Sequence, residues 1–289
     1  ILLYAVLHLA GFDMPLEDIA RLRRIGSKTP GHPEYGHTEG VETTTGPLGA
    51  GFATAVGMAL AERRLRERFG GGSFPVIDHY TYVLSGDGCL MEGISAEAAS
   101  LAGHLGLGKL IVYYDSNGVS IDGPTSITFT EDVTKRFEAQ SWSVFRGNAH
   151  DPEEILALTH KAQADEERPS LIVLDSVIGK GAGSMEGNPK VHGSALGAEV
   201  IAEAKRAMGI DPDEKFYVIP DAREYFASGT EARREKYRKW QGSFAEWKAD
   251  NPELARDFDA HFDMGRPYYK NAVMPDFETG AKISTRDAG

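Results

Sequence analysis

The sequence has almost no cysteine and no long apolar run, and each absence excludes a class of protein. Its 289 residues include one cysteine, Cys89, so no internal disulfide can form. A single cysteine fits a reducing compartment, and we expect a cytoplasmic location. The apolar start, residues 1–9, is interrupted by Tyr4 and His8 and lacks the basic segment of a signal peptide. No apolar run is long enough to span a bilayer, so we expect no membrane partner.

Basic residues are also scarce relative to acidic ones. The chain has 31 Lys and Arg against 43 Asp and Glu, which gives a formal net charge of -12. Nucleic acid is therefore not expected as a partner, because phosphate backbones are bound by clustered Lys and Arg. The hydrophobic fraction of 41% is ordinary for a globular protein, and the length allows one large domain or two small ones.

Short apolar runs that end at turn residues predict buried parallel strands. Residues 81–85 (TYVLS) precede Gly-Asp-Gly, residues 109–114 (KLIVYY) precede Asp-Ser-Asn-Gly, and residues 171–177 (LIVLDSV) precede a glycine-rich stretch. Helical patterns occupy segments between or beside these runs, at residues 50–69, 94–105 and after 151–152. This order predicts an α/β fold, a doubly wound, mainly parallel sheet with helices on both faces.

The character of the chain changes after about residue 210. Large apolar residues recur there at helical spacing, namely Tyr237, Trp240, Phe244, Trp247, Leu254, Phe258 and Phe262. We predict a cofactor-binding domain over residues 1–210 and a helical extension that packs on it over residues 211–264. Residues 265–289 are expected to form a connector and the beginning of another domain. Because the chain starts without Met inside an apolar pattern, we also expect that a segment precedes it.

Two polar residues follow neighbouring predicted strands. Asp87, between Gly86 and Gly88, follows the first strand, and Asn117 follows the second, 30 residues later (117 − 87). That separation fits a strand–helix–strand crossover, so both side chains are expected at the same edge of the sheet. Carboxylate and amide oxygens suit Mg2+ or Ca2+, and flanking glycines let a bulky anion approach the backbone. A lone Gly-Asp-Gly is also typical of a simple tight turn.

The sequence around Asp87 and Asn117 favours the metal site over a simple tight turn. Residues 86–123, GDGCLMEGISAEAASLAGHLGLGKLIVYYDSNGVSIDG, closely resemble the thiamine diphosphate signature of the transketolase family. The resemblance implies that Asp87 and Asn117 bind the metal through their side chains and Val119 through its backbone carbonyl. The metal would hold the diphosphate of thiamine diphosphate, and Ile121 would lie near the thiazolium. Cys89 is expected to be buried beside this loop.

Three further segments resemble loops of the same family. Residues 29–34, TPGHPE, resemble the loop whose histidine contacts the donor substrate, which implies a catalytic role for His32. Residues 42–61, ETTTGPLGAGFATAVGMALA, resemble the part that contacts the aminopyrimidine. Residues 178–193, IGKGAGSMEGNPKVHG, resemble the loop that carries a second catalytic histidine, here His192. The cofactor-binding residues implied are Gly46, Pro47, Leu48, Gly86, Gly88, Asn117, Ile121, Ile178 and His192.

Two acidic residues follow the metal signature, Glu92 and Glu97. Glu97 falls on the face of the predicted helix that also carries Ile94, Ala98 and Leu101. A carboxylate on an apolar face is costly unless it is paired or protonated, or unless it reaches solvent at the edge of that face. The resemblance places both acids at a dimer interface between two active sites. We therefore expect a homodimer with a proton-sharing network that includes Glu92 and Glu97.

The resemblance implies an activity for the parent enzyme. A transketolase transfers a two-carbon ketol unit from a ketose phosphate to an aldose phosphate, as in the pentose phosphate pathway and the Calvin cycle. In this family the glutamate that activates the aminopyrimidine lies on a pyrimidine-binding domain, together with most of the arginines that bind sugar phosphate. We therefore expect the pyrimidine-binding domain, of the same or a partner chain, as a partner. The isolated chain should be inactive.

Other functions share part of this pattern. The related enzymes 1-deoxyxylulose-5-phosphate synthase, dihydroxyacetone synthase and phosphoketolase could carry the same metal motif, but TPGHPE, TTTGPLGAG and KVHG together favour transketolase. A half-subunit that only binds the cofactor, or a non-catalytic interaction protein, is a further alternative. The presence of Asp87, Asn117, His32 and His192 argues against loss of catalysis.

Overall fold

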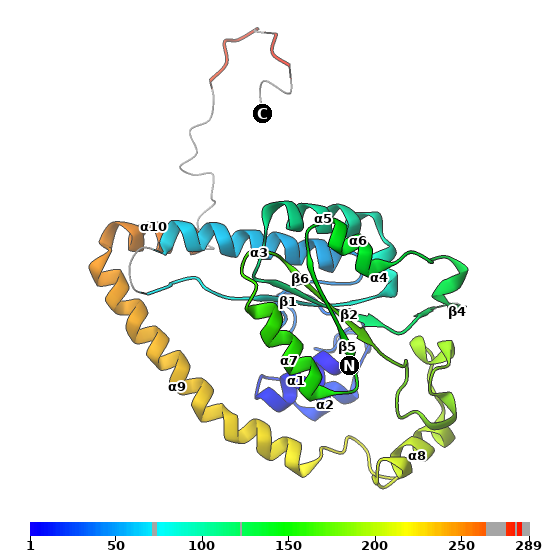
Figure 1. The fold of residues 1–289 in the computed structure, drawn as a ribbon. Helices are drawn as coiled ribbons and strands as arrows, with labels where there is room; N and C mark the ends of the chain where they lie inside the picture. Colours follow the sequence, from blue (N-terminus) through cyan, green and yellow to red (C-terminus); the bar gives the residue numbers. More distant parts are fainter. Residues whose placement is uncertain (71–73, 122, 264–275, 281, 285–289) are drawn as a thin grey trace.

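A four-stranded parallel sheet forms the centre of the molecule (Figure 1). The computed structural model describes residues 1–70, 74–121, 123–263, 276–280 and 282–284. The strands lie in the order β1 (Thr81–Gly86), β2 (Leu110–Ser116), β6 (Ser170–Asp175) and β5 (Ser143–Asn148), and all three pairings are parallel. The predicted fold class and the positions of the three predicted strands are confirmed. The expectation that all three are buried is wrong for β1, which lies at an edge of the described sheet and exposes 50% of Tyr82 and 79% of Leu84.

Strand β5 is absent from the sequence prediction. Its sequence, SVFRGN, is short and combines Arg146 and Gly147 with few apolar residues, so it lacks the Val- and Ile-rich pattern of a buried strand. It forms because β6 offers a free edge, with Val144 opposite Leu171. Pairing with a neighbouring strand, rather than local propensity, decides this element.

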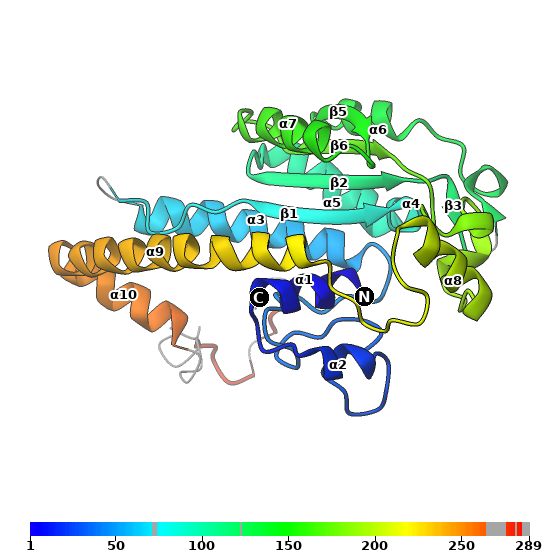
Figure 2. The same ribbon diagram turned by 90° about the horizontal axis from the view of Figure 1, so that it is seen from below.

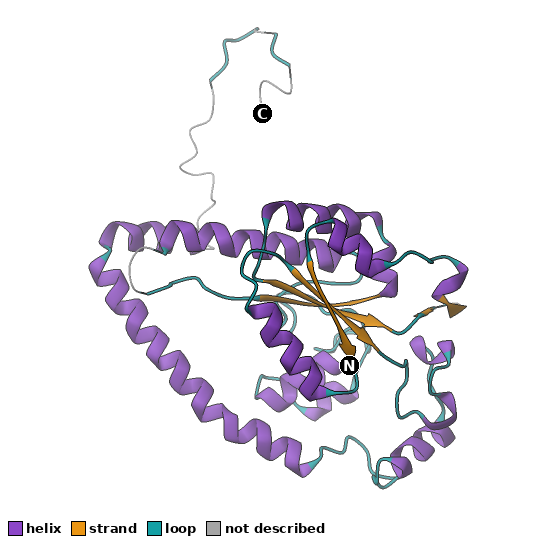
Figure 3. Cartoon of the chain, viewed as in Figure 1, coloured by secondary structure: helices purple, strands orange, loops and turns teal. Residues whose placement is uncertain are grey.

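Helices cover both faces of the sheet (Figure 3). Helices α3 (Ala50–Phe69), α5 (Gly93–Leu105) and α6 (Val133–Ala139) pack on one face, and α7 (Pro152–Gln163) packs on the other. The two apolar clusters use alternate residues of the strands: Val112 and Leu171 face α3 and α5, whereas Ile111 and Ile172 face α7. The predicted helices at residues 50–69, 94–105 and after 151–152 are therefore confirmed.

The face that α5 turns to the core differs from the predicted one. Its buried residues are small, namely Ser95, Ala99, Ala102 and Gly103. Ile94 and Leu101 are each 47% exposed, and Glu97 is exposed beside them. Small residues allow the helix to approach its neighbours closely: a Cβ on Gly103 would overlap the backbone carbonyl of Gln140. The larger apolar residues consequently form an outward-facing stripe on this chain.

The N-terminal segment makes a small core of its own. Helices α1 (Leu2–Ala10) and α2 (Leu16–Ala20) pack together, and residues 21–49 return to the sheet without regular structure. The cluster beneath them consists of Tyr4, Leu7, Met14, Ile19 and Val41. Residues 29–34, the TPGHPE loop, belong to this segment and are joined to α1 by a hydrogen bond from Tyr4 to Pro30.

The C-terminal helices run along the outside of the domain (Figure 2). They are α8 (Ala198–Ala207), α9 (Pro220–Asp250) and α10 (Pro252–Phe262). Helix α9 contacts α1, and its end packs with α10 against Phe69 at the end of α3, burying Trp247. Helices α9 and α10 lie within the segment 211–264 that was expected to be helical, and the division into domains stays a prediction. Most of the segment 265–289, predicted as a connector and the beginning of another domain, lies outside the described residues. None of the described helices is both long and apolar enough to cross a membrane.

Candidate functional site at the carboxyl edge of the sheet

The register of the sheet brings the predicted metal residues to one edge. Strands β1 and β2 are neighbours, with Gly86 opposite Asp115, so Asp87 and Asn117 follow directly where the two strands end. Asp87 begins the short helix α4 (Asp87–Met91), which contacts β3 (Val119–Ser120). The predicted adjacency of the strand ends is confirmed, since a parallel sheet places all carboxyl ends at the same edge.

The Asp87 carboxylate is buried and only half satisfied. Its side chain belongs to a residue that is 5% exposed, and Oδ1 accepts a hydrogen bond of 2.5 Å from the hydroxyl of Tyr114. Burial and the hydrogen bond to Asp87 raise the pKa of the Tyr114 phenol, so it stays protonated as a donor. Oδ2 is buried without a hydrogen-bond partner among the described residues. A buried carboxylate oxygen in this state is costly unless something else binds it.

Asn117 is held in a fixed turn beside Asp87. Its Oδ1 accepts a hydrogen bond of 3.0 Å from the backbone N–H of Val119, and its Nδ2 lies 3.2 Å from Oδ2 of Asp115. Asp115 in turn accepts from the hydroxyl of Ser176 at the end of β6. These contacts orient the amide and the following backbone through local hydrogen bonds.

The residues at this edge fit a hard divalent cation. Among the described residues, no cluster of three or more His, Cys, Asp and Glu is arranged to hold a metal ion. The set at this edge is different in kind, because it contains the single carboxylate of Asp87 and neutral oxygens from the Asn117 turn. Such a set suits Mg2+ or Ca2+ when phosphate and water supply the remaining oxygens. The unpartnered Oδ2 of Asp87 is the atom that most requires such a cation.

The predicted aminopyrimidine loop lies against the same edge. A Cβ added at Gly88 would come 3.3 Å from Cδ1 of Leu48, and one at Gly46 would come 3.5 Å from the ring of His32. A cavity of about 580 Å³ between this loop and β1 is lined by His32, Pro47, Leu48 and Cys89, among others. The structure thus brings the TPGHPE loop, residues 46–48 and the Gly-Asp-Gly turn together.

The loop that carries His32 is irregular but well anchored. The hydroxyl of Tyr4 donates to the carbonyl of Pro30 at 2.6 Å, and the N–H of Thr45 donates to the carbonyl of Pro33 at 3.2 Å. Thr29 is fully buried and donates to the carbonyl of Asp18. These bonds flank His32 on both sides, whereas its own side chain is exposed and available to a ligand.

The second histidine comes from the loop after β6. His192 ends the short helix η3 (Pro189–His192), which contacts β3. The carbonyl of Ile178 accepts from the N–H of Gly187 at 2.8 Å, and Gly179 packs against Val191. The loop therefore folds back on itself beside the metal turn. His192 itself is exposed.

Several predicted site residues face solvent on this chain. Leu48 is 52% and Ile121 71% exposed, and Glu92 and Glu97 are exposed as well. Cys89 is half-buried, which corrects the expectation that it is buried, because the cavity beside Leu48 reaches it. The predicted cofactor-binding residues therefore leave apolar surface open to solvent on this chain.

Sequence reasoning missed Tyr114. It reads as an ordinary core residue of a strand, and its hydroxyl gains significance only from its partner Asp87, 27 residues away. The alternation of β2 does carry a signal, since Val112 and Tyr114 share the face that packs toward α5 while Tyr113 points to α7.

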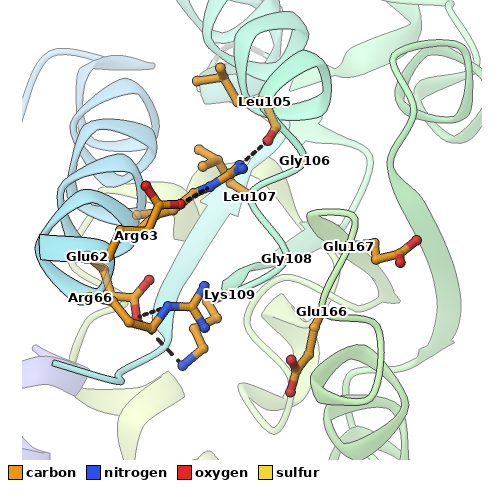
Figure 4. Close-up of a pocket in the computed structure, with 12 residues that line it drawn as sticks. Glu62, Arg63, Arg66, Leu105, Gly106, Leu107, Gly108, Lys109, Glu166 and Glu167 are labelled. Atoms are coloured by element: carbon orange, nitrogen blue, oxygen red, sulfur yellow. Dashed lines mark hydrogen bonds and ion pairs between the residues drawn. The ribbon is translucent and has the colours of Figure 1, made fainter. Parts of the chain in front are cut away.

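A second cavity, of about 350 Å³, lies at the opposite end of the sheet (Figure 4). It is lined by α3 residues, by the loop 105–109 before β2, and by Glu166 and Glu167. Glu62 is 2% exposed there, and its Oε1 lies 3.6 Å from both Nε of Arg66 and Nζ of Lys109. Oε1 accepts no hydrogen bond among the described residues, but its charge is offset by these two cationic groups, so this cavity does not require a bound cation.

The matching family model is described as "Transketolase, thiamine diphosphate binding domain" and covers residues 1–267. The transketolase of Treponema pallidum is 48% identical over 290 residues, which cover 99% of this chain and 44% of that protein. The transketolase of Bacillus subtilis is 47% identical over 287 residues, which cover 99% of this chain and 43% of that protein. The chain thus spans less than half the length of these relatives.

Solved structures agree with the sequence relatives. A transketolase from Leishmania mexicana superimposes with a TM-score of 0.87 at 44% identity, covering 90% of this chain and 39% of that one. A transketolase from Pichia stipitis in complex with sedoheptulose-7-phosphate also gives 0.87, at 41% identity, covering 89% and 38%. At these identities the likeness extends beyond the fold to the family.

Proposed function

The chain belongs to the transketolase family, as its thiamine diphosphate binding domain, and from this premise we propose that it provides the metal-binding half of a ketol-transfer site. The reaction is the transfer of a two-carbon ketol unit from a ketose phosphate to an aldose phosphate. One observation carries the proposal: the buried Oδ2 of Asp87 has no partner among the described residues, at the edge where Asn117 also lies.

In this proposal the chain's own residues hold the cofactor. Asp87, Asn117 and the carbonyl of Val119 bind Mg2+, or Ca2+ in its place, and the cation neutralises the diphosphate. The glycines of the Gly86-Asp87-Gly88 turn allow the diphosphate to approach the backbone. Thiamine diphosphate, when bound, supplies the carbanion that adds to the donor ketone.

Apolar and small residues would hold the organic part of the cofactor. Gly46, Pro47 and Leu48 would lie against the aminopyrimidine side, Ile121 near the thiazolium, and Ile178 against the cofactor. The cavity beside Leu48 and the exposure of Ile121 support this assignment, because both leave apolar surface free for a ligand.

His32 and His192 would act on the substrate. Imidazole groups at these positions donate hydrogen bonds to oxygens that gain negative charge and move protons to or from substrate hydroxyls. Their exposed side chains, on loops next to Gly46 and β3, support this role. Replacing either histidine with alanine should lower kcat and should have a smaller effect on cofactor affinity.

The covering surface would come from a pyrimidine-binding domain, of the same or a partner chain, in a homodimer. The outward stripe of Ile94 and Leu101 on α5, with Glu97 between them, supports an interface at this face. Glu92 and Glu97 would share protons across it. If Glu97→Gln left both dimer affinity and activity unchanged, the proposed network would be wrong.

Calorimetric titration of thiamine diphosphate with Mg2+ tests the site directly. The intact protein that contains this chain should bind the cofactor only with the metal present, and Asp87→Ala should abolish this binding. Equal binding by both proteins would refute the metal site. Ketol transfer from sedoheptulose-7-phosphate, which the Pichia stipitis structure holds, then tests the reaction. The isolated 289-residue chain should show no transfer, so appreciable activity would refute the need for a second domain.

A further inference from the structure

Among the described residues, Tyr114 is the one side chain that hydrogen-bonds the proposed metal-binding carboxylate of Asp87. It lies on β2, is 4% exposed, and packs in the apolar cluster that includes Val112. Its hydroxyl donates to Oδ1 of Asp87 at 2.5 Å, and this bond connects two neighbouring strand ends, since Tyr114 stands opposite Ser85 in the register. The phenol therefore belongs to the sheet rather than to the loops of the site.

The hydrogen bond makes the two oxygens of the Asp87 carboxylate different. Oδ1 is occupied by the phenol, whereas Oδ2 is buried and has no hydrogen-bond partner among the described residues. A carboxylate with one oxygen held in this way presents a single oxygen, in a fixed direction, to a cation. This matters most for Mg2+, which requires nearly ideal octahedral geometry, and less for Ca2+, which accepts irregular and bidentate coordination.

We propose that Tyr114 is a positioning residue that holds Asp87 in a monodentate orientation and thereby favours Mg2+ over Ca2+ at the cofactor site. The inference rests on the proposed function of Asp87 and adds a determinant of which cation the site accepts. Tyr114 is buried and its hydroxyl contacts the carboxylate, so its effect should be on metal affinity and selectivity.

The neighbouring residue provides a matched control. Tyr113 lies on the same strand but points to the other face, where its hydroxyl hydrogen-bonds the hydroxyl of Thr159 on α7 at 2.8 Å. Tyr114→Phe and Tyr113→Phe therefore remove the same atom from adjacent positions of β2. Only the first removes a partner of Asp87.

The experiment measures the apparent dissociation constants of Mg2+ and Ca2+ calorimetrically, at saturating thiamine diphosphate, in the intact protein and both variants. Tyr114→Phe should weaken Mg2+ binding roughly tenfold or more and Ca2+ binding less, so that the Mg2+ to Ca2+ affinity ratio falls. Tyr113→Phe should leave both constants and their ratio unchanged. Thermal unfolding of the metal-free proteins establishes that each variant is folded.

The outcomes separate this inference from the function on which it rests. If Asp87→Ala abolishes metal-dependent binding but Tyr114→Phe leaves the ratio unchanged, the metal site stands and the role of Tyr114 is refuted. A parallel loss for both cations refutes the selectivity as well, because it indicates a purely structural effect. If the unmodified intact protein binds no metal with the cofactor, the proposed function fails, and the inference fails with it.

Discussion

Two buried carboxylates at opposite ends of one sheet have opposite surroundings. Glu62, at the amino end, lies 3.6 Å from the cationic groups of Arg66 and Lys109, and Lys109 also pairs with Asp78. Asp87, at the carboxyl end, forms no ion pair among the described residues and accepts one hydrogen bond, from Tyr114. Both carboxylates have a buried oxygen that accepts no hydrogen bond among the described residues, but only Glu62 has cationic groups beside it. This difference supports the proposed cation site at the Asp87 end of the sheet.

The difference follows from the cost of burying charge. An ion taken from water into a protein interior loses several kcal/mol of solvation, which paired charges and hydrogen bonds must offset. At the amino end this compensation joins α3 to the beginning of β2, so the charges contribute to the packing of the domain. At the carboxyl end the deficit is retained in the folded chain, and an external metal ion can remove it.

The largest effect should come from removing the uncompensated charge. Asp87→Asn should weaken Mg2+-dependent binding of thiamine diphosphate by about 3 kcal/mol or more, because the metal loses its anionic ligand. Calorimetric titration measures this loss. The metal-free variant should be at least as stable as the unmodified protein, since an unpaired buried charge has been removed. A clear drop in its thermal stability would contradict the comparison.

Removing a cation from the cluster of Glu62, Arg66, Lys109 and Asp78 should lower stability and leave cofactor binding unchanged. Lys109→Met should lower the free energy of unfolding by about 3 kcal/mol, because Glu62 and Asp78 lose their shared cation. Urea unfolding of the metal-free protein measures this change, and cofactor affinity should be unaffected.

A double variant tests whether the two groups act as a pair. Lys109→Met alone removes a cation beside the Glu62 carboxylate, and adding Glu62→Gln removes that carboxylate as well. The double variant should therefore destabilise the protein by less than the sum of the two single changes. Strict additivity would mean that the 3.6 Å contact carries no interaction energy.

Supplying the missing cation should stabilise the fold. Mg2+ and thiamine diphosphate at about one hundred times their dissociation constants should raise the free energy of unfolding by about 2.7 kcal/mol. Chelation of the metal should remove this gain, as followed by thermal unfolding. The Asp87→Asn variant serves as the control and should show almost no gain, whereas Lys109→Met should show the full gain from a lower starting point.

Glycine substitutions provide the smallest contrast. A Cβ at Gly108, in the amino-end loop, would overlap the backbone of Glu166, so Gly108→Ala should cost about 2 kcal/mol of stability. A Cβ at Gly88 would meet only the end of the Leu48 side chain at 3.3 Å, and Gly88→Ala should cost less than about 1 kcal/mol. Chemical denaturation measures both, and equal costs would show that the carboxyl edge is as closely packed as the amino edge.

Much of the fold could be predicted because its signals are local. The apolar runs of β2 and β6 are almost continuous and are buried in the sheet. Asp151 before Pro152 caps α7 through the N–H groups of Glu153 and Glu154. Strand β5 escaped prediction because its sequence alone does not favour a strand. The orientation of α5 escaped as well, because periodicity shows that a helix has an apolar stripe and does not show which side meets the core.

The sequence by itself determined the family, three of the four strands of the described parallel sheet, and the residue types available for a hard cation, because these depend on local composition and spacing. The tertiary structure decided which atoms meet. Only the parallel register brings Tyr114 to Asp87, and only the packing of α3 against the start of β2 surrounds Glu62 with Arg66 and Lys109. A carboxylate is thereby placed among cationic groups at one edge and without an ion pair among the described residues at the other, since burial and partners are set by contacts distant in sequence.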